Sequence, residues 1–263
     1  MTVGALAHER VGSGPPLVLL HGIGHTRRAW DPVVDRVAAE RELVLVDLPG
    51  HGESPLPTPD APGARLGVEE LTDHVERFLG DLGLERPAVA GNSLGGALAL
   101  ELARRGVAGP VTALAPIGFW SRSALRYTIM SFHGARALVP VLRPVLPRLL
   151  RATPVRAALL AQYFAHPSRL SPAEAERTVD DFATAPGLTA ILPYSRHYRF
   201  ERGEELTGPV TVAWGDRDRL LVGRQFARAK ERLPQARHVT LRGCGHVPMP
   251  DDPAAVAAVL LAT

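Results

Sequence analysis

The feature that most constrains the fold is a regular alternation of short apolar runs with longer stretches of helical pattern. Six runs have the composition of strands: 16–20, 43–47, 87–91, 111–116, 209–215 and 237–243. The first five are almost continuously apolar, as in strands buried on both faces, and the sixth alternates more, as near an edge. Helical patterns occupy 30–40, 67–84, 94–105, 222–233 and 253–262. Because parallel strands need crossover connections, this order predicts an α/β fold with a doubly wound, mostly parallel sheet.

Residues 119–206 interrupt this rhythm. Eight prolines punctuate short helical pieces there, and 12 arginines stand against 7 acidic residues. We therefore expect residues 1–118 and 207–263 to form the α/β core, and residues 119–206 to form a helical insertion over the edge of the sheet. An apolar part of this insertion flanked by arginines, 137–164, could alternatively lie on a membrane surface. Its prolines argue against one long amphipathic helix.

Several properties of the chain limit its location and partners. No uncharged apolar stretch reaches the roughly 18 residues that span a bilayer, so we expect no stable membrane insertion. The first 14 residues lack a basic region followed by an apolar one, and Cys244 is the single cysteine, which excludes an internal disulfide. These features predict a cytoplasmic protein. The formal net charge of +3, without a basic run, indicates no nucleic-acid partner. The oligomeric state cannot be inferred.

The stretch AGNSLGGA, residues 90–97, predicts a nucleophile. Ser93 lies between Gly91 and Gly95, at the junction of a predicted strand and a predicted helix. This is the context of a nucleophile elbow, in which two glycines allow the strand and the helix to approach closely. A serine hydroxyl is a weak nucleophile, so such a site also needs a base, an orienting acid and donors for an oxyanion.

The base and the acid are expected at the ends of later strands. His246 follows the last predicted strand on a glycine-flanked loop, where an imidazole could exchange a proton with Ser93 near neutral pH. Asp216 and Asp218 follow the preceding strand, and one of them is expected to bind the imidazole Nδ1–H. The order serine, aspartate, histidine is typical of this type of triad. Cys244 is expected to be a buried packing residue rather than a nucleophile.

The oxyanion would be held by backbone N–H groups. One donor is expected from Leu94, directly after the nucleophile. The loop in LLHGIGHT, residues 19–26, supplies the other from Ile23, with Gly22 and Gly24 allowing the backbone to turn toward the substrate.

Two histidines flank that second donor. We interpret His21 as a brace for the loop, whereas His25 could face the pocket. Their spacing of four residues lies on a glycine loop rather than on a helix, so zinc is not indicated. The stretch GHGES, residues 50–54, lacks the Gly–Lys–Ser/Thr of a phosphate loop. We predict neither a metal nor a cofactor.

Five motifs together resemble the α/β-hydrolase superfamily, from about residue 8 to the last helix: HGIG (21–24), DLPGHGES (47–54), GNSLGG (91–96), WGDRD (214–218) and GCGH (243–246). The resemblance implies that Ser93 is the nucleophile and His246 the base. It favours Asp218 over Asp216 as the acid, because the family usually uses the final aspartate of this motif. It also implies a structural role for the loop 47–54.

The resemblance implies a serine hydrolase that cleaves a carboxylic ester, a thioester or a lactone through an acyl-enzyme on Ser93. Residues 119–206 would be the helical cap over the acyl or alcohol pocket. Its apolar residues and arginines favour a small-molecule substrate with an apolar part or an anionic group, although the arginines could equally form a solvated face. Haloalkane dehalogenases and epoxide hydrolases have aspartate at the nucleophile position, so Ser93 argues against both.

Two alternatives remain open. Asn92 beside Ser93 resembles the elbow of carbon–carbon bond hydrolases that act on meta-cleavage-type diketones. Those enzymes commonly carry tryptophan after the catalytic histidine, where this chain has Val247. Asn92, Val247 and His25 are thus candidate pocket residues. The other alternative is a non-catalytic ligand-binding protein on the same fold, because a fold does not dictate function.

Overall fold

The computed structural model describes residues 6–57, 66–206, 208–222 and 224–263. Within these ranges the strands are β1 (His8–Val11), β2 (Pro16–Leu20), β3 (Glu42–Val46), β4 (Ala88–Asn92), β5 (Val111–Leu114), β6 (Val210–Gly215) and β7 (Arg237–Leu241). The α-helices are α1 (Asp31–Val37), α2 (Val68–Asp81), α3 (Leu94–Arg104), α4 (Arg122–Leu142), α5 (Leu146–Leu149), α6 (Thr153–Leu160), α7 (Pro172–Thr184), α8 (Pro186–Ser195), α9 (Gln225–Arg232) and α10 (Pro253–Leu261).

The described strands form one sheet in the order β1-β3-β2-β4-β5-β6-β7. All neighbours from β3 to β7 are parallel, and β1 pairs antiparallel with β3. The prediction of a doubly wound, mostly parallel sheet is confirmed. The strand order reverses between β2 and β4, so the loops that follow these two strands lie side by side at the carboxyl end of the sheet, where ligands bind in such folds.

Both faces of the sheet are buried. In β2, Val18 and Leu20 pack into the core that includes α2 and α3, whereas Leu17 and Leu19 pack into the core that includes α1 and α10. Each apolar side chain buried in this way contributes roughly 1.5–3 kcal/mol. Burial on both faces explains why the central strands are continuously apolar rather than alternating.

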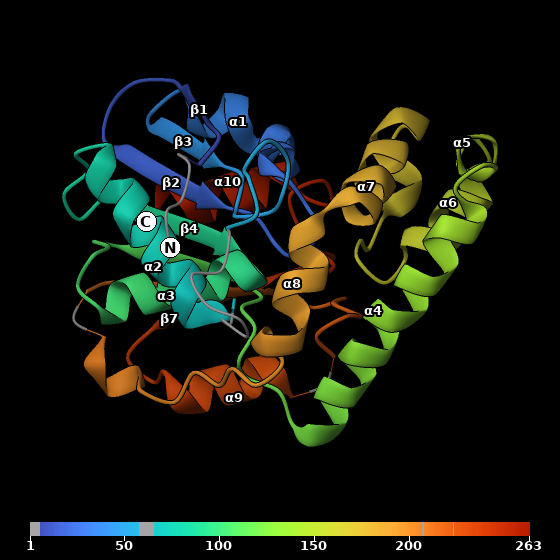
Figure 1. The fold of residues 1–263 in the computed structure, drawn as a ribbon. Coiled ribbons are helices and arrows are strands. Elements are labelled where there is room, and N and C mark those ends of the chain that lie inside the picture. Colours follow the sequence, from blue (N-terminus) through green and yellow to red (C-terminus); the bar gives the residue numbers. More distant parts are fainter. Residues whose placement is uncertain (1–5, 58–65, 207, 223) are drawn as a thin grey trace.

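Between β5 and β6 the chain forms α4 to α8, which lie to one side of the sheet, with α4 along the outer edge (Figure 1). Residues 137–164 are divided among α4, α5 and α6, as their prolines predict. The helix α4 itself runs unbroken for 21 residues through Pro140, which was expected to punctuate short helical pieces. In the described part of the chain, no helix is both long and apolar enough to cross a bilayer.

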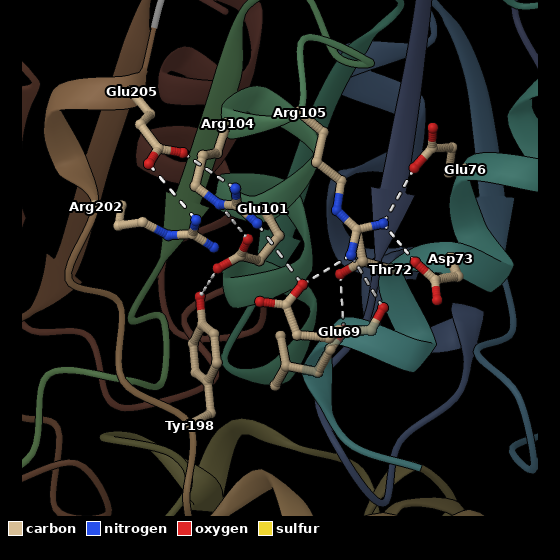
Figure 2. A network of polar contacts seen from close by, with 11 residues as sticks. Glu69, Thr72, Asp73, Glu76, Glu101, Arg104, Arg105, Tyr198, Arg202 and Glu205 are labelled. Atoms are coloured by element: carbon tan, nitrogen blue, oxygen red, sulfur yellow. Dashed lines mark hydrogen bonds and ion pairs between the residues drawn. The ribbon is translucent and has the colours of Figure 1, made fainter. Parts of the chain in front are cut away.

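A polar network ties α3 to its neighbours (Figure 2). Glu101 is buried and accepts hydrogen bonds from Tyr198 Oη at 2.7 Å and from Arg104 Nε at 2.6 Å. Arg105 forms ion pairs with three acidic side chains of α2: Glu69, Asp73 and Glu76. Since α3 begins directly after Ser93, this network joins the helix that supports the predicted nucleophile to α2 and to the end of the inserted helices.

Candidate active site

Ser93 occupies a strained turn between β4 and α3. Its backbone has φ 55° and ψ −110°, a region that costs a non-glycine residue on the order of 1–3 kcal/mol. Both flanking positions require glycine, because a side chain would collide with the backbone there. A Cβ on Gly91 would lie 2.1 Å from the carbonyl oxygen of Gly95, and a Cβ on Gly95 would lie 2.1 Å from that of Leu20. The Gly–x–Ser–x–Gly sequence therefore forms the sharp strand-to-helix turn that its spacing predicts.

His246 and Asp218 form a buried pair. Asp218 Oδ2 accepts a hydrogen bond from His246 Nδ1 at 2.9 Å, and both side chains are 3% exposed. Oδ2 also accepts from Trp214 Nε1 at 3.1 Å, while Oδ1 accepts from the backbone N–H groups of Leu220 and Leu221 at 2.9 and 2.8 Å. Four donors thus fix the carboxylate, and the carboxylate in turn fixes the imidazole, whose Nε2 has no hydrogen bond to any other described residue.

Asp216 has a different environment. It is exposed, and its Oδ1 accepts a hydrogen bond from the backbone N–H of Gly243 at 2.7 Å. Of the two aspartates that follow β6, the one within hydrogen-bonding distance of His246 is Asp218. Asp216 instead bridges the turn after β6 to the turn after β7.

Ser93 and His246 line the same narrow pocket, together with Gly22 and Ile23. In the described part of the chain, no hydrogen bond joins Ser93 Oγ to His246 Nε2. Such catalytic hydrogen bonds are often long without substrate and shorten in the substrate complex. A carbonyl carbon beside Ser93 would therefore meet the nucleophile and the free imidazole nitrogen in one enclosed space.

The two predicted oxyanion donors lie at this pocket. Ile23 and Leu94 line the space beside Ser93, and among the described hydrogen bonds neither residue uses its N–H. The loop after β2 passes directly along the serine, because a Cβ on Gly22 would lie 3.3 Å from Ser93 Cβ. Gly24 has φ +74°, which favours glycine at the turn that follows.

A pair of buried neutral histidines holds the loop after β2. His21 Nδ1 donates to the carbonyl of Gly22 at 2.8 Å, and its Nε2 accepts from the N–H of Leu48 at 2.9 Å. His51 Nε2 accepts from the N–H of Gly24 at 3.1 Å. Burial lowers the pKa of His21 well below its usual range and that of His51 to about 4. His21 thus makes the bracing contacts expected of it. The matching role of His51 was missed, although its position in the glycine-rich loop 47–54 was a usable signal.

His25 and Tyr163 bring two unpaired polar atoms to the site. Both residues line the pocket that contains Ser93, and their ring centroids lie 6.5 Å apart. His25 Nδ1 donates weakly to the carbonyl of Ile23 at 3.4 Å. Among the described residues, His25 Nε2 and Tyr163 Oη are buried without a hydrogen-bond partner. Burial lowers the pKa of His25 to about 4 and raises that of Tyr163. Two neutral groups are therefore available to a ligand.

Asn92 has a structural explanation. Its amide Nδ2 donates to the carbonyl of Leu114 at 3.2 Å and to the carbonyl of His246 at 3.0 Å. The side chain thereby ties the end of β4 to the end of β5 and to the histidine loop. Val247 is buried at the same pocket, and its N–H donates to the carbonyl of Tyr163 at 2.9 Å.

Asp251 is a positioning residue that sequence reasoning missed. It is buried, and its carboxylate accepts backbone hydrogen bonds from Gly245 at 2.8 Å, Ala165 at 2.9 Å and His166 at 2.8 Å. These contacts fasten the loop of His246 to the segment that follows α6. Two adjacent aspartates before α10 were the available signal. Only the second, Asp252, caps that helix, through Ala255 N–H.

Other reactive groups lie outside this arrangement. Cys244 is fully buried, and burial raises the pKa of its thiol to about 12, so the sulfur stays protonated. Within the described ranges, no group of three or more His, Cys, Asp or Glu side chains is placed to hold a metal ion.

Comparisons with known proteins agree with this fold. The model of the Alpha/beta hydrolase family matches residues 17–259. Epoxide hydrolase EphH from Mycobacterium tuberculosis is 33% identical over 195 residues, which cover 72% of this chain and 91% of that protein. An enol-lactonase from Burkholderia xenovorans superimposes with a TM-score of 0.77 at 19% identity, over 98% of this chain and 95% of that one. A thermophilic esterase from Thermogutta terrifontis does so with a TM-score of 0.73 at 22% identity, over 97% and 91%. The family match spans nearly the whole chain, and the chain therefore belongs to the alpha/beta hydrolase family.

Proposed function

We propose that this hydrolase cleaves carboxylic esters, or related thioesters and lactones, through an acyl-enzyme on Ser93. The observation that carries the proposal is the buried His246–Asp218 pair at 2.9 Å, which lines one pocket with a serine held in a strained elbow. Backbone strain lowers stability, and it is concentrated at functional sites. A buried acid–base pair in a pocket is likewise typical of a functional site.

Ser93, His246 and Asp218 can carry out both acylation and deacylation. Ser93 Oγ attacks the carbonyl carbon while His246 Nε2 takes its proton, and Asp218 stabilises the imidazolium through Nδ1–H. The N–H groups of Ile23 and Leu94 hold the negative oxygen of the tetrahedral intermediate. Collapse breaks the bond to the leaving group, which takes the proton from His246. Water, deprotonated by His246, then attacks the acyl carbon, releases the acid and returns the proton to Ser93.

The space around Ser93 supports a substrate with an apolar part. On one side the lining is mainly apolar: Ile23, Leu94, Ile117, Trp120, Leu125, Ile129, Phe132, Leu192, Leu220 and Leu221. On the other side, His25 and Tyr163 also line a second apolar pocket among α4, α6 and α7. The rings of Phe132 and Phe182 stack at 6.1 Å, with Phe132 lining the first pocket and Phe182 the second. This arrangement favours an aliphatic chain on at least one side of the ester.

The unpaired atoms of His25 and Tyr163 favour a neutral polar group on the substrate. With Nδ1 donating to the backbone, His25 Nε2 is an acceptor, and Tyr163 Oη can donate. A substrate hydroxyl could donate to the former and accept from the latter. An anionic group would gain less binding energy, because the pKa of His25 is lowered to about 4 and its imidazole is therefore neutral near pH 7.

Epoxide hydrolysis is disfavoured by the nucleophile itself, although one relative is named an epoxide hydrolase. Attack of Ser93 on an epoxide carbon would form an alkyl ether. An ether has no carbonyl carbon for water to attack, so the enzyme could not turn over. A carboxylate nucleophile would instead form an ester, which water can cleave. The contacts of Asn92 give this residue a structural role, so its presence beside Ser93 does not by itself support carbon–carbon bond hydrolysis.

The test compares turnover of p-nitrophenyl esters by the native protein and by Ser93→Ala. We expect the variant to lose at least about 10³-fold in kcat, with an unchanged circular dichroism spectrum. A fluorophosphonate probe should label Ser93 in the folded protein and should not label the variant or the denatured protein. Undiminished turnover by the variant would contradict the assignment of Ser93. Failure of the probe to label folded protein that lacks ester turnover would favour a non-catalytic ligand-binding protein.

A further inference from the structure

One part of the surface combines exposed apolar side chains with an excess of positive charge. Five of the six large apolar side chains that are exposed in the described structure lie between residues 127 and 145. They are Tyr127, Met130, Leu138, Val141 and Val145, and we call this set the α4 face. Met130 and Val141 are 69% and 73% exposed. Single exposed apolar residues are ordinary, but a cluster on one element marks an interaction surface.

Four of the five residues lie on one side of α4, and Val145 follows the end of that helix. Residues 127, 130, 138 and 141 recur at spacings of three, eight and three, which place them along the same stripe of α4. The buried residues of this helix, Ala124, Thr128 and Phe132, form a separate stripe of α4. The helix α4 runs along the outer edge of the molecule (Figure 1), and at one end of the α4 face the hydroxyl of Tyr127 donates a hydrogen bond to the carbonyl of Arg219 at 2.8 Å.

The segment that carries this face contains basic but no acidic residues. From Leu102 to Ala173 the sequence contains ten arginines and no aspartate or glutamate. Five of these arginines are exposed on or next to α4: Arg122, Arg126, Arg136, Arg143 and Arg148. Among the described ion pairs, Arg143 alone of the five has a partner, Asp180 at 3.6 Å. The face therefore presents apolar side chains within a fringe of positive charge.

We propose that the α4 face docks the protein peripherally on an anionic lipid bilayer. Apolar side chains of an interfacial helix enter the boundary between headgroups and acyl chains, and each arginine near an anionic surface contributes about 1 kcal/mol. The alternative occupant, a second copy of this chain packed through the same face, would bring two arginine-rich fringes together. Like charges across an interface oppose association, so the charge pattern favours the lipid surface over self-association.

The docking surface also lies next to the site. Leu138 belongs to the α4 face and also lines the apolar pocket that His25 and Tyr163 share with the pocket of Ser93. An aliphatic chain leaving the bilayer at this face would thus meet an apolar path toward the nucleophile. This link rests on the proposed function, whereas docking itself does not.

The test is co-sedimentation of the full chain with vesicles of phosphatidylcholine alone or of phosphatidylcholine and phosphatidylglycerol in equal amounts. One variant, Met130→Asp/Val141→Asp, removes the apolar contact, and a second, Arg126→Glu/Arg136→Glu, reverses the charge. The control, Arg36→Glu/Arg237→Glu, makes the same change in net charge at exposed positions on α1 and β7. None of these side chains lines the pockets beside Ser93.

We expect binding to the mixed vesicles only, and weaker binding when salt rises from about 0.1 M to about 1 M. Charge reversal at Arg126 and Arg136 should lower the partition coefficient at least about 25-fold, or fivefold for each arginine lost. The aspartate variant should lose binding, and the control should keep most of it. Turnover of a soluble ester should stay unchanged in all three, which shows that they fold. Equal binding by control and charge-reversal variants, no binding to mixed vesicles, or a dimer in sedimentation velocity that Val141→Asp abolishes would overturn the proposal.

Discussion

Replacing Asp218 by asparagine tests the acid–base pair at its most specific point. The carboxylate receives four hydrogen bonds and donates none: two backbone N–H groups at Oδ1, and His246 Nδ1–H and Trp214 Nε1–H at Oδ2. An asparagine side chain offers one oxygen and one NH₂ group. In either orientation, its NH₂ group therefore faces two donors. His246 can relieve one conflict only by moving its proton to Nε2, which disables it as a base toward Ser93.

These contacts set the expected losses of stability and of kcat in Asp218→Asn. With His246 in the changed tautomer, one buried donor, Trp214 Nε1–H, loses its acceptor, so the free energy of unfolding should fall by about 1–3 kcal/mol. The wrong tautomer should lower kcat on the order of 10⁴-fold, as for the corresponding change in a serine protease. That loss corresponds to about 5.4 kcal/mol in the activation barrier.

Asp216→Asn is the matched control. Asp216 is exposed and accepts one hydrogen bond from Gly243 N–H, which an asparagine oxygen can also accept. We expect its kcat to stay within about twofold of the native value. Both variants are assayed with a p-nitrophenyl ester at a temperature where circular dichroism shows them folded. A loss of less than tenfold in Asp218→Asn, or an equal loss in Asp216→Asn, would refute the assignment of the acid.

Three further changes test the supports of the site. Gly95→Ala should unfold at a markedly lower urea concentration than the native protein, because its Cβ would lie 2.1 Å from a backbone oxygen. Gly80→Ala has free space for its Cβ and should stabilise α2 by about 0.5–1 kcal/mol. Similar unfolding midpoints for the two variants would contradict this reasoning. The pKa of His51 is lowered to about 4, so the folded state binds fewer protons than the unfolded state, and its stabilising effect is lost as pH falls below about 6.5. Urea unfolding at pH 6.5 and pH 5 should show that His51→Gln removes about 2 kcal/mol of that pH dependence, and an unchanged slope would show that His51 is not buried in its neutral form. Tyr198→Phe should lower the free energy of unfolding by about 1.5–3 kcal/mol, because buried Glu101 loses a donor at 2.7 Å, while kcat should hardly change.

Most of the sheet could be predicted from the sequence, because strands buried on both faces are continuously apolar. The strand β1, His8–Val11, was not predicted, and its pattern explains why. It has four residues, lies at the sheet edge and is half-exposed, so neither its composition nor its alternation separates it from a loop. The unbroken helix α4 was also missed, because a proline in the last turn looks the same in the sequence as a proline that ends a helix.

The site was predictable where local sequence fixes geometry. The elbow at Ser93 and the placement of Asp218 and His246 depend on short motifs that carry their own turn chemistry. Contacts between segments that are distant in the sequence could not be predicted in this way. Asp251 accepts N–H groups from residues 85 and 86 positions earlier, and Tyr163 reaches the pocket from the segment after α6. No periodicity or spacing predicts which aspartate of an adjacent pair faces inward.

Asn92 shows why the residue beside the nucleophile is a poor guide to the substrate. Its position at the end of β4 places the amide between the carbonyl of Leu114 and the carbonyl of His246, at 3.2 and 3.0 Å. Bridging two carbonyls requires two N–H groups on one short, planar side chain, which asparagine has and aspartate lacks. The need for this bridge arises from the distance between β4 and the histidine loop, and is the same for any acyl group bound at Ser93. Substrate selection in this protein is therefore expected from the inserted helices and from His25 and Tyr163, whose polar atoms remain open to a ligand.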